Sequence, residues 1–195
     1  GLLEDQPKLK NLLKSIEYPM LRSLIKVETN GAKIDARMLA EYSDELAIKI
    51  EELSLAAFKM AGEEFNMDSP KQLVEILYNK LNLPVLKKTP KGQPSTNEDT
   101  LQRLAEEYDL PKIIIEYRGL AKLKSTYTDS LINIQHPVSK RIHTSYQQAV
   151  TSTGRLSSTE PNLQNIPIKT AEGRKIREAF IAEKGNVLIS ADYSQ

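Results

Sequence analysis

The chain has 195 residues, with 27 Lys and Arg against 26 Asp and Glu, and it contains no cysteine. Disulfides and thiolate metal sites are therefore excluded, and a reducing compartment fits. No apolar run approaches the roughly 18 residues that a membrane span needs. Charged residues make up 27% of the chain, which favours a helical protein with a large polar surface over a compact barrel.

The N-terminal part of the chain is predicted to be helical. Residues 12–27 indicate a shorter helix that is interrupted or shifted at Pro19. Asp35 is a suitable N-cap for a longer one, because its side chain can accept a free backbone N–H. Apolar residues then recur at steps of three or four as far as Met60, which predicts a helix of about 27 residues ending near Gly62. One narrow apolar stripe on so long a helix indicates an arm that packs against a single partner.

Short helices and a second long helix are predicted next. Ser69 and Gln72 have the spacing of a capping box, as do Ser95 and Glu98. Each pair predicts the start of a short helix. Between these helices the chain is basic and rich in turn residues. Pro111 then opens a long helix whose apolar residues recur at helical spacing. Two long helices with small helices at the tip predict a hairpin-like arm.

The last third of the chain has a different pattern. Apolar and polar residues alternate over 142–150, which predicts a half-buried strand. Residues 151–167 follow as a long loop of Ser, Thr, Gly, Asn and Pro, and loops of that length are usually functional or disordered. A second strand is predicted at 187–191. The predicted fold class is thus mainly α with a small β part (α+β): a two-helix arm with short tip helices, plus a partial antiparallel sheet.

Three features carry candidate chemistry. Asp192 follows the predicted strand at 187–191, where a rigid carboxylate can hold Mg²⁺, although an Asp in that place also serves as a turn or cap residue. The loop offers Arg155, small hydroxyls and amides, which are donors for sugar–phosphate and base edges or else an ordinary polar surface. Between Arg118 and Arg141 the chain has five basic residues against Asp129 alone, which indicates a phosphate-binding patch or a solvated helix face.

Several blocks of sequence resemble family A DNA polymerases, and they occur in the expected order. From the C-terminus backwards they are residues 192–195, 161–167, 153–158, 122–127, 116–118, 83–89 and 65–73. Asp192-Tyr193-Ser194-Gln195 is similar to the opening of the first catalytic motif of that family. The resemblance covers the chain from about Ile16 onwards.

The resemblance implies a role for individual residues. Asp192 would be a catalytic metal ligand in the palm, and the backbone carbonyl of Tyr193 would be a further ligand for Mg²⁺ in the intact enzyme. Arg155 would contact the minor-groove side of the primer–template. The other residues implied to contact DNA are Ser157, Ser158, Asn162, Gln164, Lys87, Lys88, Lys91, Lys122, Lys124, Ser125, Thr126 and Tyr127.

The resemblance also implies an organisation and a function. Residues 1–30 would be a helical base, 31–136 the thumb and 137–195 the N-terminal part of the palm. The intact parent would transfer dNTPs to a primer 3′ end in DNA replication and repair, as a cytoplasmic, nucleoid-associated monomer that contacts no membrane. The second catalytic aspartate and the nucleotide-binding fingers are not in this chain, so we expect the isolated chain to be inactive. The alternative is a non-enzymatic helical DNA-binding module.

Overall fold

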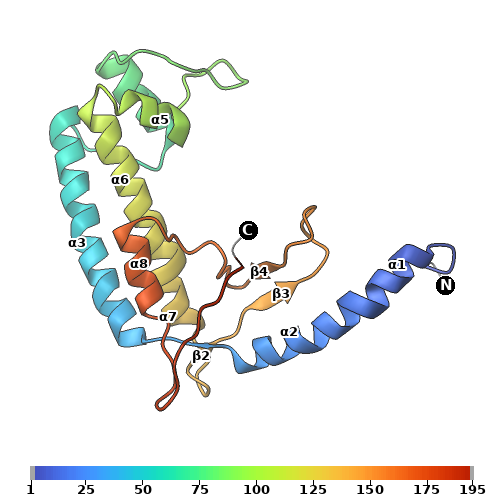
Figure 1. Ribbon diagram of the computed structural model, residues 1–195. Helices are drawn as coiled ribbons and strands as arrows, with labels where there is room; N and C mark the ends of the chain where they lie inside the picture. The colour runs from blue at the N-terminus through green and yellow to red at the C-terminus, as the bar shows by residue number, and fades with distance from the viewer. Residues whose placement is uncertain (1–2, 194–195) are drawn as a thin grey trace. The chain divides into compact units, whose positions relative to one another are not determined.

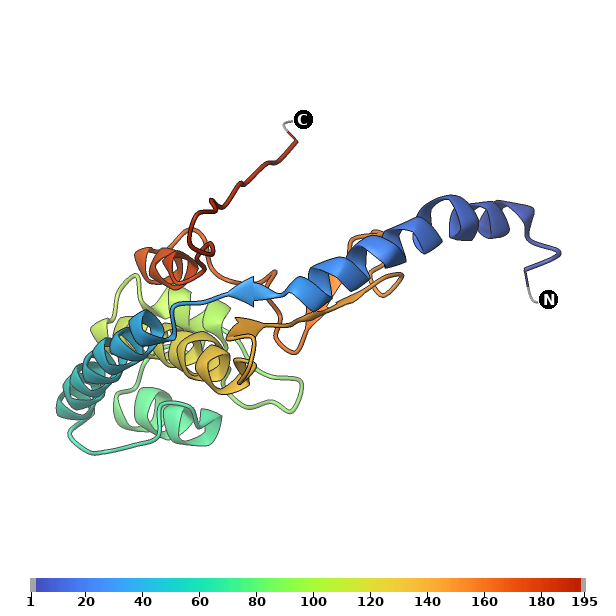
Figure 2. The same ribbon diagram turned by 90° about the horizontal axis from the view of Figure 1, so that it is seen from below.

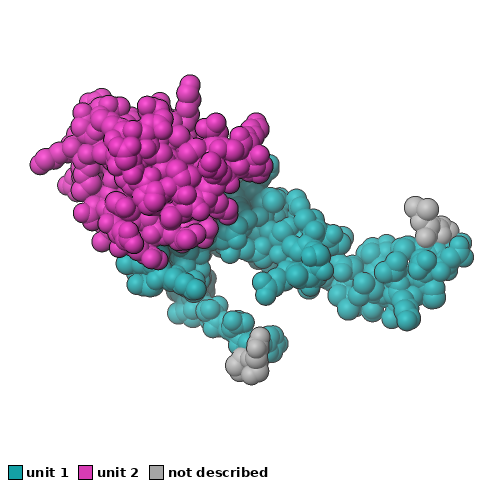
Figure 3. Space-filling model, turned by 90° about the horizontal axis from the view of Figure 1, so that it is seen from above, with its two compact units in different colours: residues 1–39, 130–195 teal, residues 40–129 magenta. Residues whose placement is uncertain are grey.

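The computed structural model describes residues 3–193. The chain forms two compact units: residues 1–39 together with 130–195, and residues 40–129 (Figure 3). Helices dominate, and the β part of the described chain is two antiparallel sheets of two strands each (Figure 1). The predicted fold class, mainly α with a small β part, is confirmed. No helix in residues 3–193 is both long enough and apolar enough to cross a membrane.

The N-terminal helix is longer than the sequence pattern indicated. It consists of α1 (Pro7–Leu12), a π-helical turn η1 (Leu13–Glu17) and α2 (Tyr18–Asn30). Pro19 is the second residue of α2, and its missing N–H falls directly after the π-helical turn. The chain therefore accommodates Pro19 by one wider turn before it, and the helix continues. At the C-terminal end, Gly31 adopts a φ of 61° and donates its N–H to a carbonyl of the last turn.

The longest helix is α3 (Ala36–Ala61), and its predicted limits are confirmed. Asp35 Oδ1 accepts the N–H of Met38 at 3.0 Å, so it caps the first turn. Gly62 has a φ of 72°, and its N–H donates to Phe58 O at 2.8 Å. A glycine adopts this left-handed conformation at little cost, which ends the helix.

Residues 40–129 contain the remaining part of the arm. After α3 its elements are α4 (Pro70–Val74), η2 (Glu75–Lys80), α5 (Glu98–Leu104), α6 (Asp109–Leu123) and η3 (Lys124–Asp129). Ser69 caps α4 by accepting the N–H of Gln72 at 3.4 Å, as predicted. The Gln72 side chain, however, accepts the N–H of Asn66 at 2.7 Å. The predicted capping box is thus only half formed, because Gln72 closes the preceding loop instead.

The start of α5 differs from the prediction. Its N-cap is Asn97, whose Oδ1 accepts the N–H of Thr100 at 3.0 Å. Ser95 lies two residues earlier and accepts the N–H of Asn97 at 3.4 Å. Asn and Ser have similar capping strength, so spacing alone did not separate them. The Ser95 carbonyl is used elsewhere, since it accepts the buried hydroxyl of Tyr78.

The apolar core of residues 40–129 lies at the end of the arm that carries the short helices (Figure 1). Its fully buried members include Ala57 of α3, Leu77 of η2 and Leu104 of α5. Arg118 braces this region: its Nε donates to Met67 O at 3.2 Å, and its guanidinium also donates to Thr96 O at 3.0 Å. One arginine therefore holds two loops against α6.

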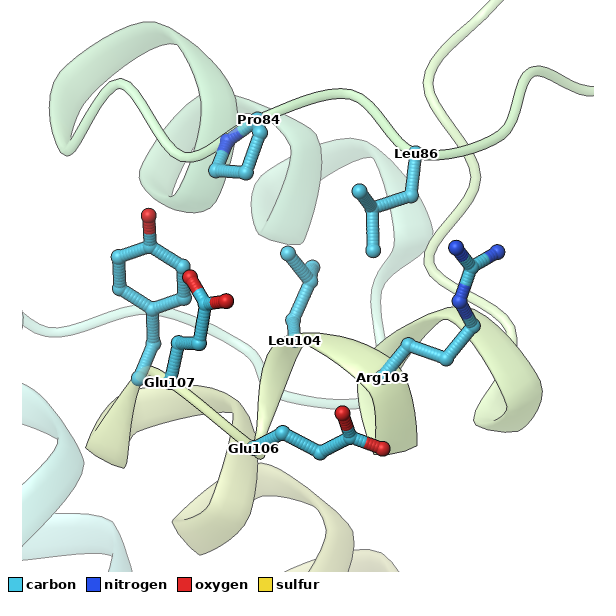
Figure 4. Close-up of a pocket in the computed structure, with 7 residues that line it drawn as sticks. Pro84, Leu86, Arg103, Leu104, Glu106 and Glu107 are labelled. Atoms are coloured by element: carbon cyan, nitrogen blue, oxygen red, sulfur yellow. The ribbon is translucent and has the colours of Figure 1, made fainter.

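A small pocket of about 150 Å³ opens beside α5 (Figure 4). Leu104 rises from the helix toward the loop that carries Pro84 and Leu86. Charged side chains of Arg103 and Glu106 stand at its rim. Leu104, which lines this pocket, is also a member of the buried core of the arm's tip.

The β strands belong to the unit of residues 1–39 and 130–195, together with α7 (Ser130–Ile134) and α8 (Ala171–Glu178). The strand predicted at 142–150 is broken in two. Strand β2 (Arg141–Ile142) pairs with β1 (Ala32–Lys33), and β3 (Ser145–Gln147) pairs with β4 (Ser157–Thr159). The pairing partner changes between Ile142 and Ser145, and an alternating pattern does not reveal such a change.

The strand predicted at 187–191 does not form. These residues have no regular structure, and the side chains of Val187, Leu188 and Ile189 are 79%, 66% and 87% exposed. A strand needs a neighbour that satisfies its backbone groups. Among residues 3–193, no segment pairs with this one. The apolar pattern of 187–191 thus does not give a strand among the described residues.

Candidate nucleic-acid interface

The loop between β3 and β4 displays Arg155. Gly154 has a φ of 77°, and its N–H donates to Thr151 O at 3.3 Å. The Thr151 hydroxyl then donates to the Arg155 carbonyl at 2.7 Å. These two bonds close a tight turn whose backbone is fixed, while the side chain of Arg155 is exposed and bonds to none of the described residues. A guanidinium held this way is available to phosphate or base acceptors.

The segment after β4 displays two amide side chains. Asn162 and Gln164 are both exposed, and Asn162 Oδ1 accepts the N–H of Gln164 at 3.0 Å. The two serines of β4 behave differently. Ser158 is 1% exposed and fully hydrogen-bonded, whereas Ser157 Oγ is buried without a hydrogen-bond partner in the described chain. The amides face solvent, and the hydroxyls face inward.

The β3–β4 hairpin is fastened to α2, beside which it lies in Figures 1 and 2. Glu28 Oε1 accepts the N–H of Tyr146 at 2.6 Å. The side-chain amide of Gln148 donates to Glu17 O at 3.2 Å and also to the Glu17 carboxylate. A carboxylate thus satisfies a strand-edge N–H, and the helix becomes a rigid support for the loop.

Lys124 is already paired within the arm. Its Nζ lies 2.8 Å from Asp129 Oδ2, and Asp129 also accepts the hydroxyl of Ser43. Burial by itself would raise the pKa of Asp129. The hydrogen bonds from Lys124 and Ser43, with the charge of Lys124, outweigh this and lower that pKa below its ordinary value. Lys122 is exposed on α6. Of these two lysines, Lys122 is the one that presents its charge to solvent.

The other residues expected on the arm differ in exposure. Ser125 and Thr126 are exposed, but Tyr127 is only 6% exposed, and burial raises the pKa of its hydroxyl. The prediction of a Tyr127 contact with DNA therefore falls on a side chain that lies inside the arm. The exposed lysines of the turn-rich loop are Lys87, Lys88 and Lys91.

Most of the basic side chains that were expected to form a patch between Arg118 and Arg141 bond to other residues of the chain. Arg118 braces the tip, as described above. Arg141 donates to Asn30 O at 2.6 Å and lies 3.0 Å from Glu183. Hydrogen bonding and the charge of Lys33, with the charge of Arg141, lower the pKa of Glu183 against a weaker effect of burial. These arginines stabilise loops and strands, so counting basic residues overestimated the charge available to phosphate.

Asp192 is exposed, and Tyr193 is fully exposed. A carboxylate and a backbone carbonyl are the hard oxygen donors that Mg²⁺ accepts, so these two residues fit the ion chemically. They supply two ligands only. Among residues 3–193, no group of three or more His, Cys, Asp or Glu side chains could hold a metal ion. The last two residues of the motif, 194 and 195, lie outside the described part of the chain.

Several residues that hold the candidate site were not predicted from the sequence. Thr144, Glu28 and Asp129 each bond to a partner far away in sequence: Thr144 to Ser158, Glu28 to Tyr146, and Asp129 to Ser43. The only signal available in the sequence was a polar residue at an apolar position of an alternating pattern. Of these three residues, only Thr144 gave that signal. Partners separated by 14 to 118 residues have no spacing rule.

The described residues thus include a helical arm with exposed lysines and a fixed loop that displays arginine and amide side chains, which are groups that can bind phosphate and base acceptors. Comparison with known sequences is more specific. Residues 36–195 match the model of DNA polymerase family A. The chain belongs to this family.

Relatives share the sequence along nearly the whole chain. It is 56% identical over 194 residues to DNA polymerase I of Pseudomonas aeruginosa, and 46% identical over 194 residues to DNA polymerase I of Bacillus subtilis. Each alignment covers 99% of this chain, but only 21% and 22% of the relative. The chain thus spans about a fifth of the length of these relatives.

A solved structure has the same fold. The POL domain of Pol1 from M. smegmatis, in complex with a DNA primer-template and a dNTP, superposes with a TM-score of 0.83 and is 41% identical in sequence. The match covers 90% of this chain and 31% of that one.

Proposed function

We propose that this chain is the thumb and the N-terminal part of the palm of a template-directed DNA polymerase, with residues 31–136 as thumb and 137–195 as palm. The exposed Arg155 on its fixed turn is the observation that carries the proposal. Its partner is the primer–template duplex, and dNTP is the substrate of the complete enzyme. The solved Pol1 complex with primer-template and dNTP supports this assignment by analogy.

Two surfaces would bind the duplex in different ways. The exposed lysines of the arm attract phosphates without regard to sequence, and each charge lost weakens the salt dependence of binding. Arg155, Asn162 and Gln164 donate directional hydrogen bonds from a fixed loop. Lys124, Ser158 and Tyr127, which are engaged inside the chain, would support these contacts instead of making them.

Asp192 would be the catalytic carboxylate. Together with the Tyr193 carbonyl it would hold Mg²⁺, which in phosphoryl transfer neutralises developing charge on the reacting oxygens. Since these residues supply two ligands, the remaining ones must come from other residues of the complete enzyme or from water and substrate. We therefore expect the isolated 195-residue chain to show no primer extension.

Replacement of Arg155 tests the proposal. In the full-length polymerase carrying this segment, Arg155→Ala should weaken primer–template binding about tenfold, because one directional charged contact is worth about 1–3 kcal/mol. Arg22→Ala removes an equally charged, exposed side chain from α2 and should change affinity less than about twofold. Equal effects of both substitutions would contradict a specific role for Arg155.

The polymerase fragment and the alternative, a non-enzymatic DNA-binding module, differ in the DNA affinity that they predict for the isolated chain. For a polymerase fragment we expect duplex affinity no better than the non-specific range of about 10⁻⁴–10⁻⁶ M, falling steeply as salt is raised. Fluorescence anisotropy across a salt series measures both quantities. Tight, salt-independent binding by the isolated chain would favour the module.

A further inference from the structure

Two buried hydroxyls meet behind the loop that carries Asn162. Thr144, just before β3, is 6% exposed, and Ser158 in β4 is 1% exposed. Their oxygens lie 2.7 Å apart. Thr144 Oγ1 lies 2.7 Å from Pro161 O, and Ser158 Oγ accepts the N–H of Leu163 at 3.1 Å. Fourteen residues separate the two hydroxyls in sequence, so the hairpin pairing brings them together.

Counting hydrogens limits the directions that this network can take. Each hydroxyl has one hydrogen to donate and two lone pairs. The shortest contacts are used when Leu163 N–H donates to Ser158, Ser158 donates to Thr144, and Thr144 donates to Pro161 O. Two longer contacts compete: Thr144 Oγ1 lies 3.0 Å from Thr159 O, and Ser158 Oγ lies 3.0 Å from Pro161 O. The result is a chain of three hydrogen bonds, the hydroxyl relay, in which each bond polarises the next.

The relay begins and ends on either side of Asn162. It takes its first hydrogen from Leu163 N–H and delivers its last to Pro161 O. Both peptide groups that flank Asn162 are therefore fixed to the buried hairpin. The side chain is fixed as well, since Asn162 Oδ1 accepts the N–H of Gln164 at 3.0 Å. Only an oxygen can accept there, so Nδ2, with two hydrogens, is the group left to face an external acceptor.

We propose that Thr144 and Ser158 are positioning residues whose relay holds Asn162 so that Nδ2 donates to an oxygen of the sugar–phosphate backbone of bound DNA. This inference rests on the proposed function. The Asn162 amide is neutral and releases no counterion when it binds. Its contribution to affinity is therefore insensitive to salt, unlike that of a lysine or arginine.

Two substitutions at Thr144 distinguish the effect of its hydroxyl from the effect of its side-chain shape. In the full-length polymerase, Thr144→Val keeps the branched side chain but removes the hydroxyl that lies closer to Pro161 O, at 2.7 Å against 3.0 Å for Ser158. We expect it to weaken primer–template binding about tenfold, by the same factor at 50 and 200 mM salt. Thr144→Ser keeps the hydroxyl and should restore affinity to within about twofold. Equal affinities of the Val and Ser variants would overturn the proposal.

A double substitution tests whether the relay acts through Asn162. Asn162→Ala should also weaken binding about tenfold, and Thr144→Val added to it should cause no further loss. If the two losses multiply, the relay acts on something else and the inference is wrong. Ser158→Ala interrupts the same relay and should behave like Thr144→Val. If thermal unfolding shows that both relay variants are unfolded, the hydroxyls are needed for the fold, and the positioning role is also wrong.

Failure of this inference and failure of the proposed function give different results. If Arg155→Ala weakens binding while Asn162→Ala does not, the polymerase assignment stands and the relay proposal falls. If neither substitution changes binding or primer extension, the loop is not a DNA interface and both proposals fall.

Discussion

The tip of the arm and the segment of residues 186–193 place apolar side chains in opposite settings. Leu77 is fully buried among side chains from α3, α5 and α6, whereas Ile189 is 87% exposed. Both residues stand in apolar runs of the sequence. The tip finds all its partners within about 60 residues of chain, because helices satisfy their own backbone groups and bury only a face. A strand needs a neighbouring segment as well.

Exposure is also high along the N-terminal helix. Its apolar side chains Leu9, Leu12, Ile16, Leu21 and Ile25 are each between 44% and 54% exposed. The chain spans about a fifth of the length of its polymerase relatives. We propose that residues of the complete enzyme cover both the N-terminal helix and residues 187–189. If so, the tip buries its apolar side chains within the chain, whereas the N-terminal helix and residues 187–189 need further residues to bury theirs.

The largest effect is expected in the tip. Leu77→Ala should lower the free energy of unfolding of the isolated chain by about 3 kcal/mol, through lost burial and a residual cavity. Urea unfolding at pH 7 measures this. Leu86→Ala, at a side chain that is 38% exposed, is the matched control and should cost less than about 1 kcal/mol. Similar costs at both positions would show that the tip has no well-packed core.

Arg118 should have the next largest effect. Arg118→Met keeps much of the aliphatic stem but leaves Met67 O and Thr96 O without their donor. We expect a loss of about 2 kcal/mol, typical of hydrogen bonds from a charged group. Arg103→Met, at an exposed position on α5, should be within about 0.5 kcal/mol of the unsubstituted chain. If Arg118→Met is equally neutral, the two hydrogen bonds of Arg118 do not stabilise the tip.

Asp129 gives a pH-dependent effect. Its pKa is lower in the folded chain than the ordinary value of 3.8, so its ionised form stabilises the fold above that value. This contribution disappears as pH falls through the folded pKa. Asp129→Asn should therefore cost about 0.5–1 kcal/mol at pH 7, as for a partly exposed ion pair, and little at pH 2. Chemical unfolding at both values checks this; a cost that is independent of pH would contradict the Lys124 pairing.

The smallest effect is expected at Ile189. In the isolated chain, Ile189→Ser should change the free energy of unfolding by less than about 0.5 kcal/mol, because the side chain is already in water. In the full-length polymerase the same substitution should cost about 2 kcal/mol or more, if the segment becomes a buried strand. Thermal unfolding of both proteins makes the comparison. Neutrality in both would show that residues 187–189 remain uncovered.

Much of the fold follows from local signals. The limits of α3 come from Asp35 and Gly62, whose caps form as predicted. The start of α4 at Ser69 is likewise local. The strands were harder, since β2 and β3 take different partners, one of them about 110 residues away in sequence. Local pattern thus predicts helices well, while strand pairing depends on contacts that the pattern does not contain.

In the candidate site, too, some residues could be predicted from the sequence and others could not. Arg155 and Asn162 were expected from their chemistry and the family resemblance, and both are exposed. The residues that hold them were not expected, because Thr144 and Glu28 lack any motif. Lys124 and Lys122 are indistinguishable in sequence, yet only Lys124 lies beside Asp129. Whether a residue could contact DNA or instead holds the fold is decided by its exposure and its bonding partners, not by its residue type.

The most direct test of the account is Asp192→Asn in the full-length polymerase that carries this segment. Because the substitution removes a metal-ligating charge and leaves the arm and loop unchanged, primer extension should fall about a thousandfold or more. Primer–template affinity, measured in parallel, should stay within about twofold. Extension that persists at near its original rate, or a loss of DNA binding as large as the loss of extension, would contradict the assignment of Asp192 as the catalytic carboxylate.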